Sequence, residues 1–108
     1  MNERPVLEAI LDAMRAARPA VLATVVRTRG SVPRHAGSRM LVELGRGLVG
    51  TIGGGCGEAD VIAAAAEVLA SGRPRLIEVR LMDDVQSWSP AVCGGVMEIF
   101  VEPIGARA

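Results

Sequence analysis

The chain has 108 residues, half of them hydrophobic, and its 12 basic residues balance its 12 acidic residues. A formal net charge of zero gives no general electrostatic attraction to nucleic acid or to anionic membranes, which argues against both classes of binding protein. No segment approaches the ~20 apolar residues that span a bilayer, and the start of the chain lacks the basic-then-apolar pattern of a signal peptide. We therefore expect one soluble, cytoplasmic, globular domain over residues 1–108, with its two cysteines as free thiols.

Helical spacing marks the start of the chain. Leu7, Ile10, Leu11 and Met14 recur every three or four residues, which predicts an amphipathic helix with these four side chains on its buried face. Residues 20–28 follow as a nearly continuous, β-branched apolar run. Such a run is typical of a central strand that is buried on both faces.

A loop and a hairpin are predicted next. Residues 29–37 have the composition of a loop, and residues 39–44 then alternate, with Met40, Val42 and Leu44 on one face. A turn at residues 45–47 leads into a second strand at 48–52, so the two strands form a hairpin.

The second half of the chain predicts a helix followed by two strands. Glu58 and Asp60 suit the first turn of a helix, and Gly72 ends it. The expected buried face of this helix carries Ile62, Ala65, Ala66 and Leu69. Alternation at residues 75–81 and 96–102 predicts the last two strands, and Met14, Met40 and Met97 fall at expected core positions.

The element order α-β-β-β-α-β-β predicts a compact, single-domain α/β fold with two main helices on a mixed β-sheet. The junction between the third strand and the second helix is unusual, because three consecutive glycines, Gly53, Gly54 and Gly55, precede Cys56 and Gly57. Glycines at such a junction let the backbone approach a ligand, and a thiol at a helix start ionises more readily than a free cysteine. Cys93 also precedes two glycines, Gly94 and Gly95, so the two thiols are interpreted as parts of one site.

Three common kinds of site are disfavoured. The glycine run lacks the Lys-Ser or Lys-Thr of a Walker motif, and the chain contains no lysine. The spacing of its glycines does not match the dinucleotide-binding fingerprint. Two cysteines and one histidine are too few ligands for a structural zinc site.

The sequence also shows no acid–base pair and no nucleophilic triad. We therefore expect no catalytic residues.

Several motifs together resemble the N-terminal domain of the XdhC/CoxI family. They are Ala-Thr-Val-Val at 23–26, Gly-Ser-Val-Pro-Arg at 30–34, Gly-Ser-Arg-Met at 37–40, Gly-Thr-Ile-Gly-Gly-Gly-Cys-Gly-Glu at 50–58, and Cys-Gly-Gly at 93–95 followed by Ile-Phe-Val-Glu-Pro at 99–103. Members of this family are accessory proteins of molybdenum hydroxylases such as xanthine dehydrogenase and aerobic carbon monoxide dehydrogenase. The resemblance implies an accessory protein, not an enzyme, that binds molybdenum cofactor (molybdopterin) transiently, assists its sulfuration by a cysteine desulfurase and inserts it into a hydroxylase apoenzyme.

The resemblance also indicates partners and site residues. Longer members continue into a Rossmann-like C-terminal domain, so a separate protein of that type is a candidate partner, and a homo-oligomer is expected. The candidate cofactor-binding residues are Gly53, Gly54, Gly55, Cys56, Gly57, Glu58, Cys93, Gly94, Gly95, Arg29, Ser31, Arg34 and Arg39. Cys56 is the first choice for contact with molybdenum or for carrying sulfur, and Cys93 is the second.

Two other functions stay open. The first is a thiol redox or sulfur-transfer module in which Cys56 and Cys93 cycle between dithiol and disulfide, which requires their Cα atoms to lie within ~7 Å of each other. The second is a docking or assembly module without a ligand. Tolerance of Cys56→Ser favours the docking module.

Overall fold

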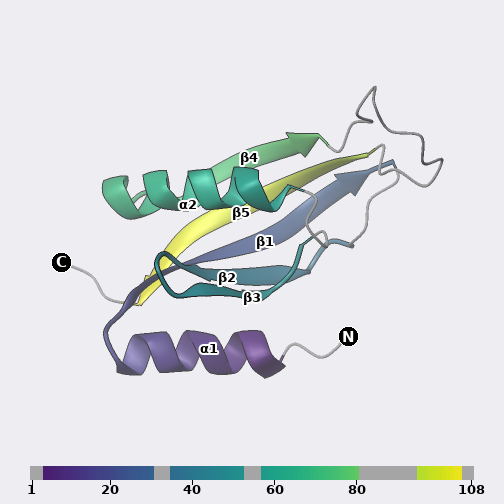
Figure 1. Cartoon of the computed structure of the whole chain (residues 1–108). Coiled ribbons are helices and arrows are strands. Elements are labelled where there is room, and N and C mark those ends of the chain that lie inside the picture. Colours follow the sequence, from purple (N-terminus) through teal and green to yellow (C-terminus); the bar gives the residue numbers. More distant parts are fainter. Residues whose placement is uncertain (1–3, 31–34, 53–56, 81–94, 106–108) are drawn as a thin grey trace.

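A computed structural model describes residues 4–30, 35–52, 57–80 and 95–105, and shows two helices and one five-stranded sheet (Figure 1). In chain order the elements are α1 (Arg4–Arg15), β1 (Pro19–Arg29), β2 (Arg39–Glu43), β3 (Gly47–Gly50), α2 (Glu58–Ser71), β4 (Arg75–Arg80) and β5 (Val96–Gly105). The predicted order α-β-β-β-α-β-β is confirmed. Neither helix in the described part of the chain is long and apolar enough to cross a membrane.

The strand order across the sheet is β3-β2-β1-β5-β4, and β1 is the central strand, as predicted. All four strand pairings are antiparallel, which corrects the mixed sheet expected from the sequence. The reason is the crossover through α2, which carries the chain from one edge strand, β3, to the other edge strand, β4. β3 and β4 run in the same direction, but they lie at opposite edges of the sheet and do not pair. All pairs of neighbouring strands are therefore antiparallel.

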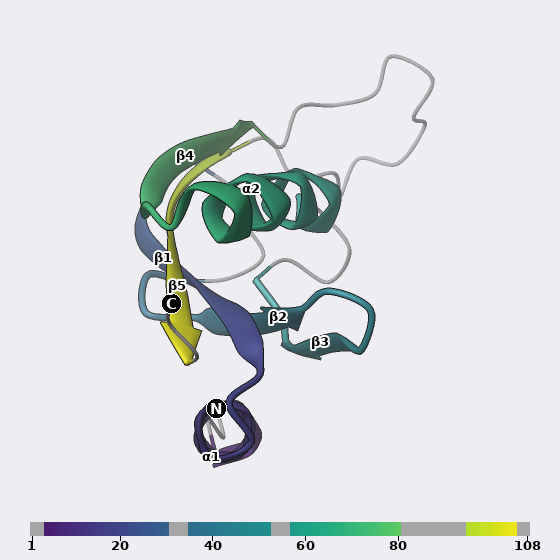
Figure 2. The same ribbon diagram turned by 90° about the vertical axis from the view of Figure 1, so that its left-hand side faces the viewer.

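The main core lies between the sheet and α2. Alternate residues of the central strands point to this side, and Val25, Met40 and Ile99 are fully buried there. On α2 the buried residues are Val61, Ala64, Ala65 and Val68. The small alanine side chains let the helix lie close to the sheet, which curves around it in Figure 2.

A second, smaller core lies on the opposite face of the sheet, under α1 (Figures 1 and 2). Ala13 of the helix, Ala20 of β1 and Leu41 of β2 are fully buried in it. Val6 also faces the sheet and is 5% exposed. The two helices thus cover opposite faces, and both pack through small or β-branched residues.

Only part of the side that apolar spacing predicts faces the sheet on each helix. The prediction is confirmed for Ala65 and Leu69 of α2, and Ile10 of α1 also packs against the second core. On α1 the structure buries Val6 and Ala13, and leaves Leu7, Leu11 and Met14 substantially exposed. On α2, Val61 and Ala64 are buried while Ile62 is 38% exposed and Ala66 is exposed. Of the three methionines, Met40 and Met97 are confirmed as core residues, whereas Met14 is not.

The end of α1 is tied to the β2–β3 turn by charged side chains. Arg18, which follows the helix, donates from Nε to Oε1 of Glu43 at 2.8 Å and from Nη2 to Oδ2 of Asp12 at 2.6 Å. Arg46 in the turn lies 3.5 Å from the same Glu43 oxygen. This cluster stabilises the end of the molecule where β1 begins and β5 finishes.

Candidate functional site

Three connections lie at the other end of the sheet. Because the strands are antiparallel, the β1–β2 connection (30–38), the β3–α2 connection (51–57) and the β4–β5 connection (81–95) all leave from the same end (Figure 1). All thirteen candidate site residues lie on these connections or on the residues that directly flank them. The fold therefore brings segments that are distant in the sequence to one end of the molecule.

Strand register shows how the connections are spaced. Arg29 pairs with Val96, so the β1–β2 connection begins beside the end of the β4–β5 connection. At its other end, Arg39 pairs with Thr24, while the adjacent Met40 pairs with Gly50. Since Arg29 lies five residues beyond Thr24 on β1, the two ends of the β1–β2 connection are about 16 Å apart along the strand. The β1–β2 connection thus begins beside the start of β5 and ends beside the end of β3.

The start of α2 is held by residues on both sides of the glycine run. Ile52 is fully buried in the main core, which anchors the chain directly before Gly53. Gly57 then adopts a left-handed conformation with φ of 79°, and no side chain caps the helix. The hydroxyl of Thr51 donates to Oε2 of Glu58 at 3.0 Å, so the two ends of the connection are joined by a hydrogen bond.

Thr51 and Ile52 support the start of α2, and they are not among the candidate site residues selected from the sequence. The Thr51–Glu58 hydrogen bond spans seven residues, a spacing that matches no capping motif, and Ile52 lies beyond the end of β3. The available signal was the apolar Ile52 directly before three glycines. It marks the point at which the chain is fixed before the glycine run begins.

Five candidate residues lie within the described part of the chain. Gly57 and Glu58 form the start of α2, Gly95 is buried next to the first residue of β5, and Arg29 and Arg39 flank the β1–β2 connection. The other eight lie outside the described residues: Ser31, Arg34, Gly53, Gly54, Gly55, Cys56, Cys93 and Gly94. The predicted contact between the two thiols and the molybdenum roles of Cys56 and Cys93 therefore stay predictions.

The side chains of Arg29 and Arg39 leave the backbone on the face of the sheet opposite α2. Arg39 pairs with Thr24, whereas its neighbour Met40 belongs to the core on the α2 side. Arg29 lies 3.3 Å from Glu78 of β4, to which its Nη2 donates. The Arg29 guanidinium is thus turned to a carboxylate across the sheet and not toward the start of α2.

The start of α2 combines opposing electrostatic contributions. Its uncapped N–H groups and helix dipole favour an anion, while the carboxylates of Glu58 and Asp60 in the first turn offset part of that preference. The Thr51 hydroxyl already occupies one oxygen of Glu58. This arrangement suits a ligand with hydrogen-bond donors as well as acceptors better than a simple anion. Within the described ranges, no group of three or more His, Cys, Asp or Glu side chains is placed to hold a metal ion.

The chain is similar to known proteins over most of its length. Residues 13–80 match the model of the XdhC and CoxI family. The chain is 38% identical over 89 residues to the uncharacterized protein YqeB of Escherichia coli, and 34% identical over 96 residues to the molybdenum cofactor insertion chaperone PaoD of the same organism. It is 35% identical over 108 residues to a probable xanthine dehydrogenase subunit of Bacillus subtilis. These matches cover 82%, 87% and 95% of this chain.

A solved structure shares the fold. The crystal structure of a xanthine dehydrogenase from Bacillus halodurans superposes with a TM-score of 0.74 and 30% sequence identity over 90% of this chain. The match covers 30% of that protein, and the three sequence matches cover 16%, 29% and 31% of theirs. The chain therefore spans less than a third of the length of each of these relatives.

Proposed function

The chain belongs to the XdhC and CoxI family, and from this premise we propose that it is an accessory chaperone that binds molybdenum cofactor and delivers it to a hydroxylase apoenzyme. The similarity to the PaoD chaperone supports this class of function. The cofactor is cargo in this proposal, and the protein itself is not an enzyme.

The observation that carries the proposal is the meeting of three connections at one end of the sheet. A pterin dithiolene with a terminal phosphate is an extended ligand, and it needs contacts of different chemistry at separate points. The connections offer glycine backbone and a thiol at 53–57, a second thiol at Cys93, and a serine and an arginine at Ser31 and Arg34. The opposite end of the sheet carries neither cysteine nor a glycine run.

The start of α2 is the part of the site that we assign to the pterin or phosphate. The glycine backbone from Gly53 to Gly57 supplies N–H donors and leaves room for close approach. Glu58 accepts hydrogen bonds from the amino-pyrimidine edge of the pterin, through the carboxylate that Thr51 holds in place. Both groups suit a ligand that is anionic at one end and carries donors at the other.

The two thiols are the part of the site that we assign to the metal end. Molybdenum in this cofactor is bound by sulfur, and thiolates are the soft ligands that such a metal prefers. Cys56 directly precedes Gly57 at the start of α2, so the helix dipole favours its thiolate form. We assign Cys56 the first contact with molybdenum or the carriage of sulfur, and Cys93 the second.

The arginines have unequal roles in this proposal. Arg29 forms an ion pair with Glu78, and the side chain of Arg39 leaves the backbone on the α1 face of the sheet. We therefore propose that these two arginines stabilise the β1–β2 connection and do not bind the ligand. Ser31 and Arg34 lie within that connection and are assigned to the ligand, since an arginine binds phosphate through two parallel hydrogen bonds.

The proposed partners follow from the chaperone role. A molybdenum hydroxylase apoenzyme receives the cofactor, and a cysteine desulfurase supplies the sulfur for its maturation. A separate Rossmann-like protein of the kind found at the C-terminus of longer family members is a further proposed partner.

The proposal is tested by anaerobic titration with molybdenum cofactor released from a donor enzyme, using wild type, Cys56→Ser and Cys93→Ser. We expect stoichiometric binding by wild type, loss of binding in Cys56→Ser and weaker binding in Cys93→Ser. Correctly folded wild type that binds no cofactor would contradict the chaperone function and favour the docking module. A reversible Cys56–Cys93 disulfide without cofactor binding would instead favour the redox module.

A matched pair of glycine variants separates binding from stability. Gly57 and Gly72 lie at the two ends of α2, with φ of 79° and 73°, so an alanine introduces similar backbone strain at either position. We expect Gly57→Ala to weaken cofactor binding and Gly72→Ala to leave it unchanged, although both lower the free energy of unfolding by about 1 kcal/mol. Equal effects on binding would show that the helix start has no specific role.

A further inference from the structure

Helix α1 presents a row of large apolar side chains to solvent. Leu7, Leu11 and Met14 are 47%, 49% and 54% exposed, and their spacing of four and three residues places them on one side of the helix. The sheet-facing side carries the smaller Val6 and Ala13. A helix of a globular domain ordinarily buries its largest apolar residues, so a row of this kind indicates a surface that another molecule covers.

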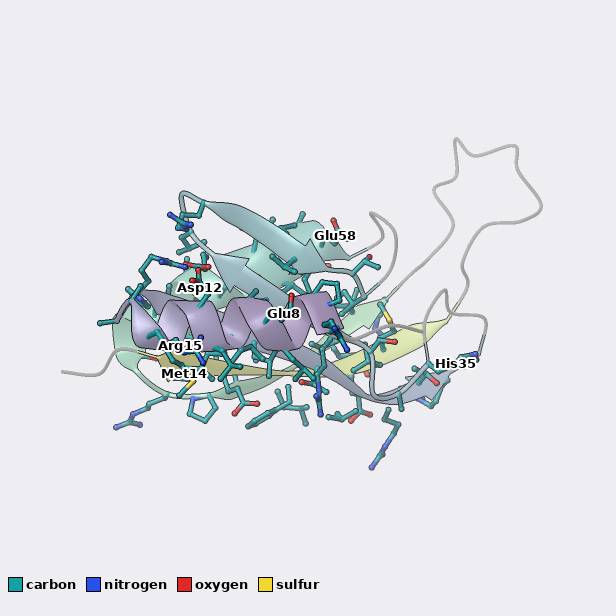
Figure 3. The ribbon with its side chains drawn as sticks, turned by 90° about the horizontal axis from the view of Figure 1, so that it is seen from below. Glu8, Asp12, Met14, Arg15, His35 and Glu58 are labelled. Carbon is teal, nitrogen blue, oxygen red and sulfur yellow. The ribbon has the colours of Figure 1, made fainter. Side chains whose placement is uncertain are left out.

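Two opposite charges border this row. Glu8 and Arg15 are both exposed, and Figure 3 shows them on the side of α1 that faces away from the sheet, while Met14 lies toward one edge of the helix and Asp12 toward the other. Along the helix, Glu8 precedes Leu11 by three residues and Arg15 follows it by four. Leu7 and Met14 have a similar placement on either side of Leu11.

This pattern is self-complementary when two copies of the helix lie antiparallel. With a two-fold axis at Leu11, Leu7 contacts Met14 of the partner subunit, and Glu8 lies opposite Arg15 of the partner subunit. Each contact then occurs twice, as a two-fold interface requires. In a parallel two-fold pair, the sides of the two helices that carry Glu8 and Arg15 would lie on opposite flanks of the interface, so these opposite charges would not meet across it.

We propose that two copies of this chain associate through antiparallel α1 helices, with Leu7, Leu11 and Met14 at the centre and the Glu8–Arg15 pairs beside them. A helix of 12 residues is about 18 Å long, so the interface is smaller than the ~800 Å² per partner of a standard complex. The dimer is therefore reversible, and its population depends on concentration. Its formation does not require cofactor binding.

The test is sedimentation velocity from micromolar to millimolar concentration, in reducing buffer so that no intermolecular disulfide contributes. We expect wild type to approach twice the monomer mass of 11.2 kDa as concentration rises. Leu11→Arg places two like charges at the axis, and this variant is expected to stay monomeric. Ile62→Arg is the control, because it makes the same kind of change at an apolar, 38% exposed position of α2.

Charge exchange tests the antiparallel geometry. Glu8→Arg and Arg15→Glu alone each create two like-charge contacts, and each is expected to raise the dimer dissociation constant by roughly tenfold or more. The double variant Glu8→Arg/Arg15→Glu restores opposite charges and is expected to dimerise like wild type. Circular dichroism of each variant confirms that the fold is retained.

Three results would overturn the proposal. They are a wild type that stays monomeric at every concentration, a dimer that Leu11→Arg leaves intact, and a double variant that fails to recover. A monomeric wild type would assign the α1 row to a different protein.

Discussion

Arg18 connects three parts of the chain through two hydrogen bonds. It reaches Asp12 on α1 and Glu43 at the end of β2, while its own backbone begins the connection to β1. The hydrogen bond from Arg18, and then its positive charge, hold the pKa of Asp12 below the ordinary value of 3.8. The bonds to Glu43 and Asp12 in turn raise the pKa of Arg18, so this guanidinium stays charged at every pH at which the protein folds.

The depressed pKa of Asp12 predicts a loss of stability in acid. The carboxylate form is favoured in the folded protein, so its contribution is present above the unfolded pKa of 3.8 and is lost as pH falls through the lower folded pKa. Asp12→Asn cannot lose this contribution. We expect the melting temperature of wild type to exceed that of Asp12→Asn at pH 7, and the difference to shrink below pH ~4. Parallel melting curves across this range would show that the Arg18–Asp12 pair does not stabilise the fold.

Individual residues show what could be predicted from the sequence. Met40 and Met97 lie on strands, where strict alternation identifies the buried face, and both are fully buried. Met14 lies on a helix with more than one apolar side, and helical spacing alone does not show which side meets the sheet. The Thr51–Glu58 hydrogen bond could not be predicted either, because its two ends meet only when Ile52 is fixed in the core.

At the scale of elements, Gly50 determines how closely α1 approaches the end of β3. Its φ is +85°, and a Cβ at this position would lie 2.6 Å from the backbone oxygen of Arg39 and 2.7 Å from Cγ2 of Val6. Glycine is thus required both by conformation and by the contact between α1 and the hairpin. The same residue directly precedes the connection that carries Cys56.

We expect Gly50→Ala to lower the free energy of unfolding by about 1–3 kcal/mol, because the added methyl group pushes Val6 and the β2 backbone apart. Gly45→Ala is the matched control, since Gly45 has a similar φ of +88° and a Cβ added there would meet no atom within 4 Å. Urea denaturation of both variants measures the difference. Equal losses of stability would mean that only backbone strain, and not the α1 contact, makes glycine necessary at position 50.

The end of α1 carries a second conformational strain. Ala17 has φ of 56°, a left-handed value that an alanine rarely adopts, and Arg18 donates its N–H to the carbonyl of Ala13 at 2.9 Å. Glycine is the usual residue at this position after a helix. The backbone thus accepts a strained alanine in order to place Arg18 next to Asp12 and Glu43.

We expect Ala17→Gly to raise the free energy of unfolding by about 1 kcal/mol, since it removes the left-handed strain. Ala63→Gly, at an exposed position inside α2, is expected to lower it by about 0.5–1 kcal/mol. Thermal melts of the two variants should therefore shift in opposite directions. A destabilised Ala17→Gly would mean that the methyl group of Ala17 contributes packing that outweighs its strain.

The elements themselves were predictable, whereas their relative placement was only partly so. Apolar alternation and turn residues located all five strands and both helices, with ends that differ from the structure by a few residues. The antiparallel sheet could not be predicted, because sequence patterns do not reveal that α2 links the two edge strands. The side that each helix turns toward the sheet depends on small residues such as Ala13 and Ala64, which allow close approach to the sheet although they are only weakly hydrophobic.

For the whole molecule, the topology places different groups of residues at the two ends of the sheet. One end is fixed by the Arg18, Asp12, Glu43 and Arg46 cluster. The other end gathers the connections that carry the two cysteines and the glycine run. From the sequence, the glycine run that carries Cys56 and the glycine pair that follows Cys93 are interpreted as parts of one site. The antiparallel strand order gives a physical reason, because both connections leave from the same end of the sheet.

The central claim is that these three connections form a single cofactor site. Hydrogen–deuterium exchange with and without molybdenum cofactor, under anaerobic conditions, tests it most directly. We expect peptides covering residues 30–38, 51–57 and 81–95 to become protected together, while the β2–β3 turn and the end of α2 exchange unchanged. Protection at the opposite end of the sheet, or at only one of the three connections, would contradict the single site.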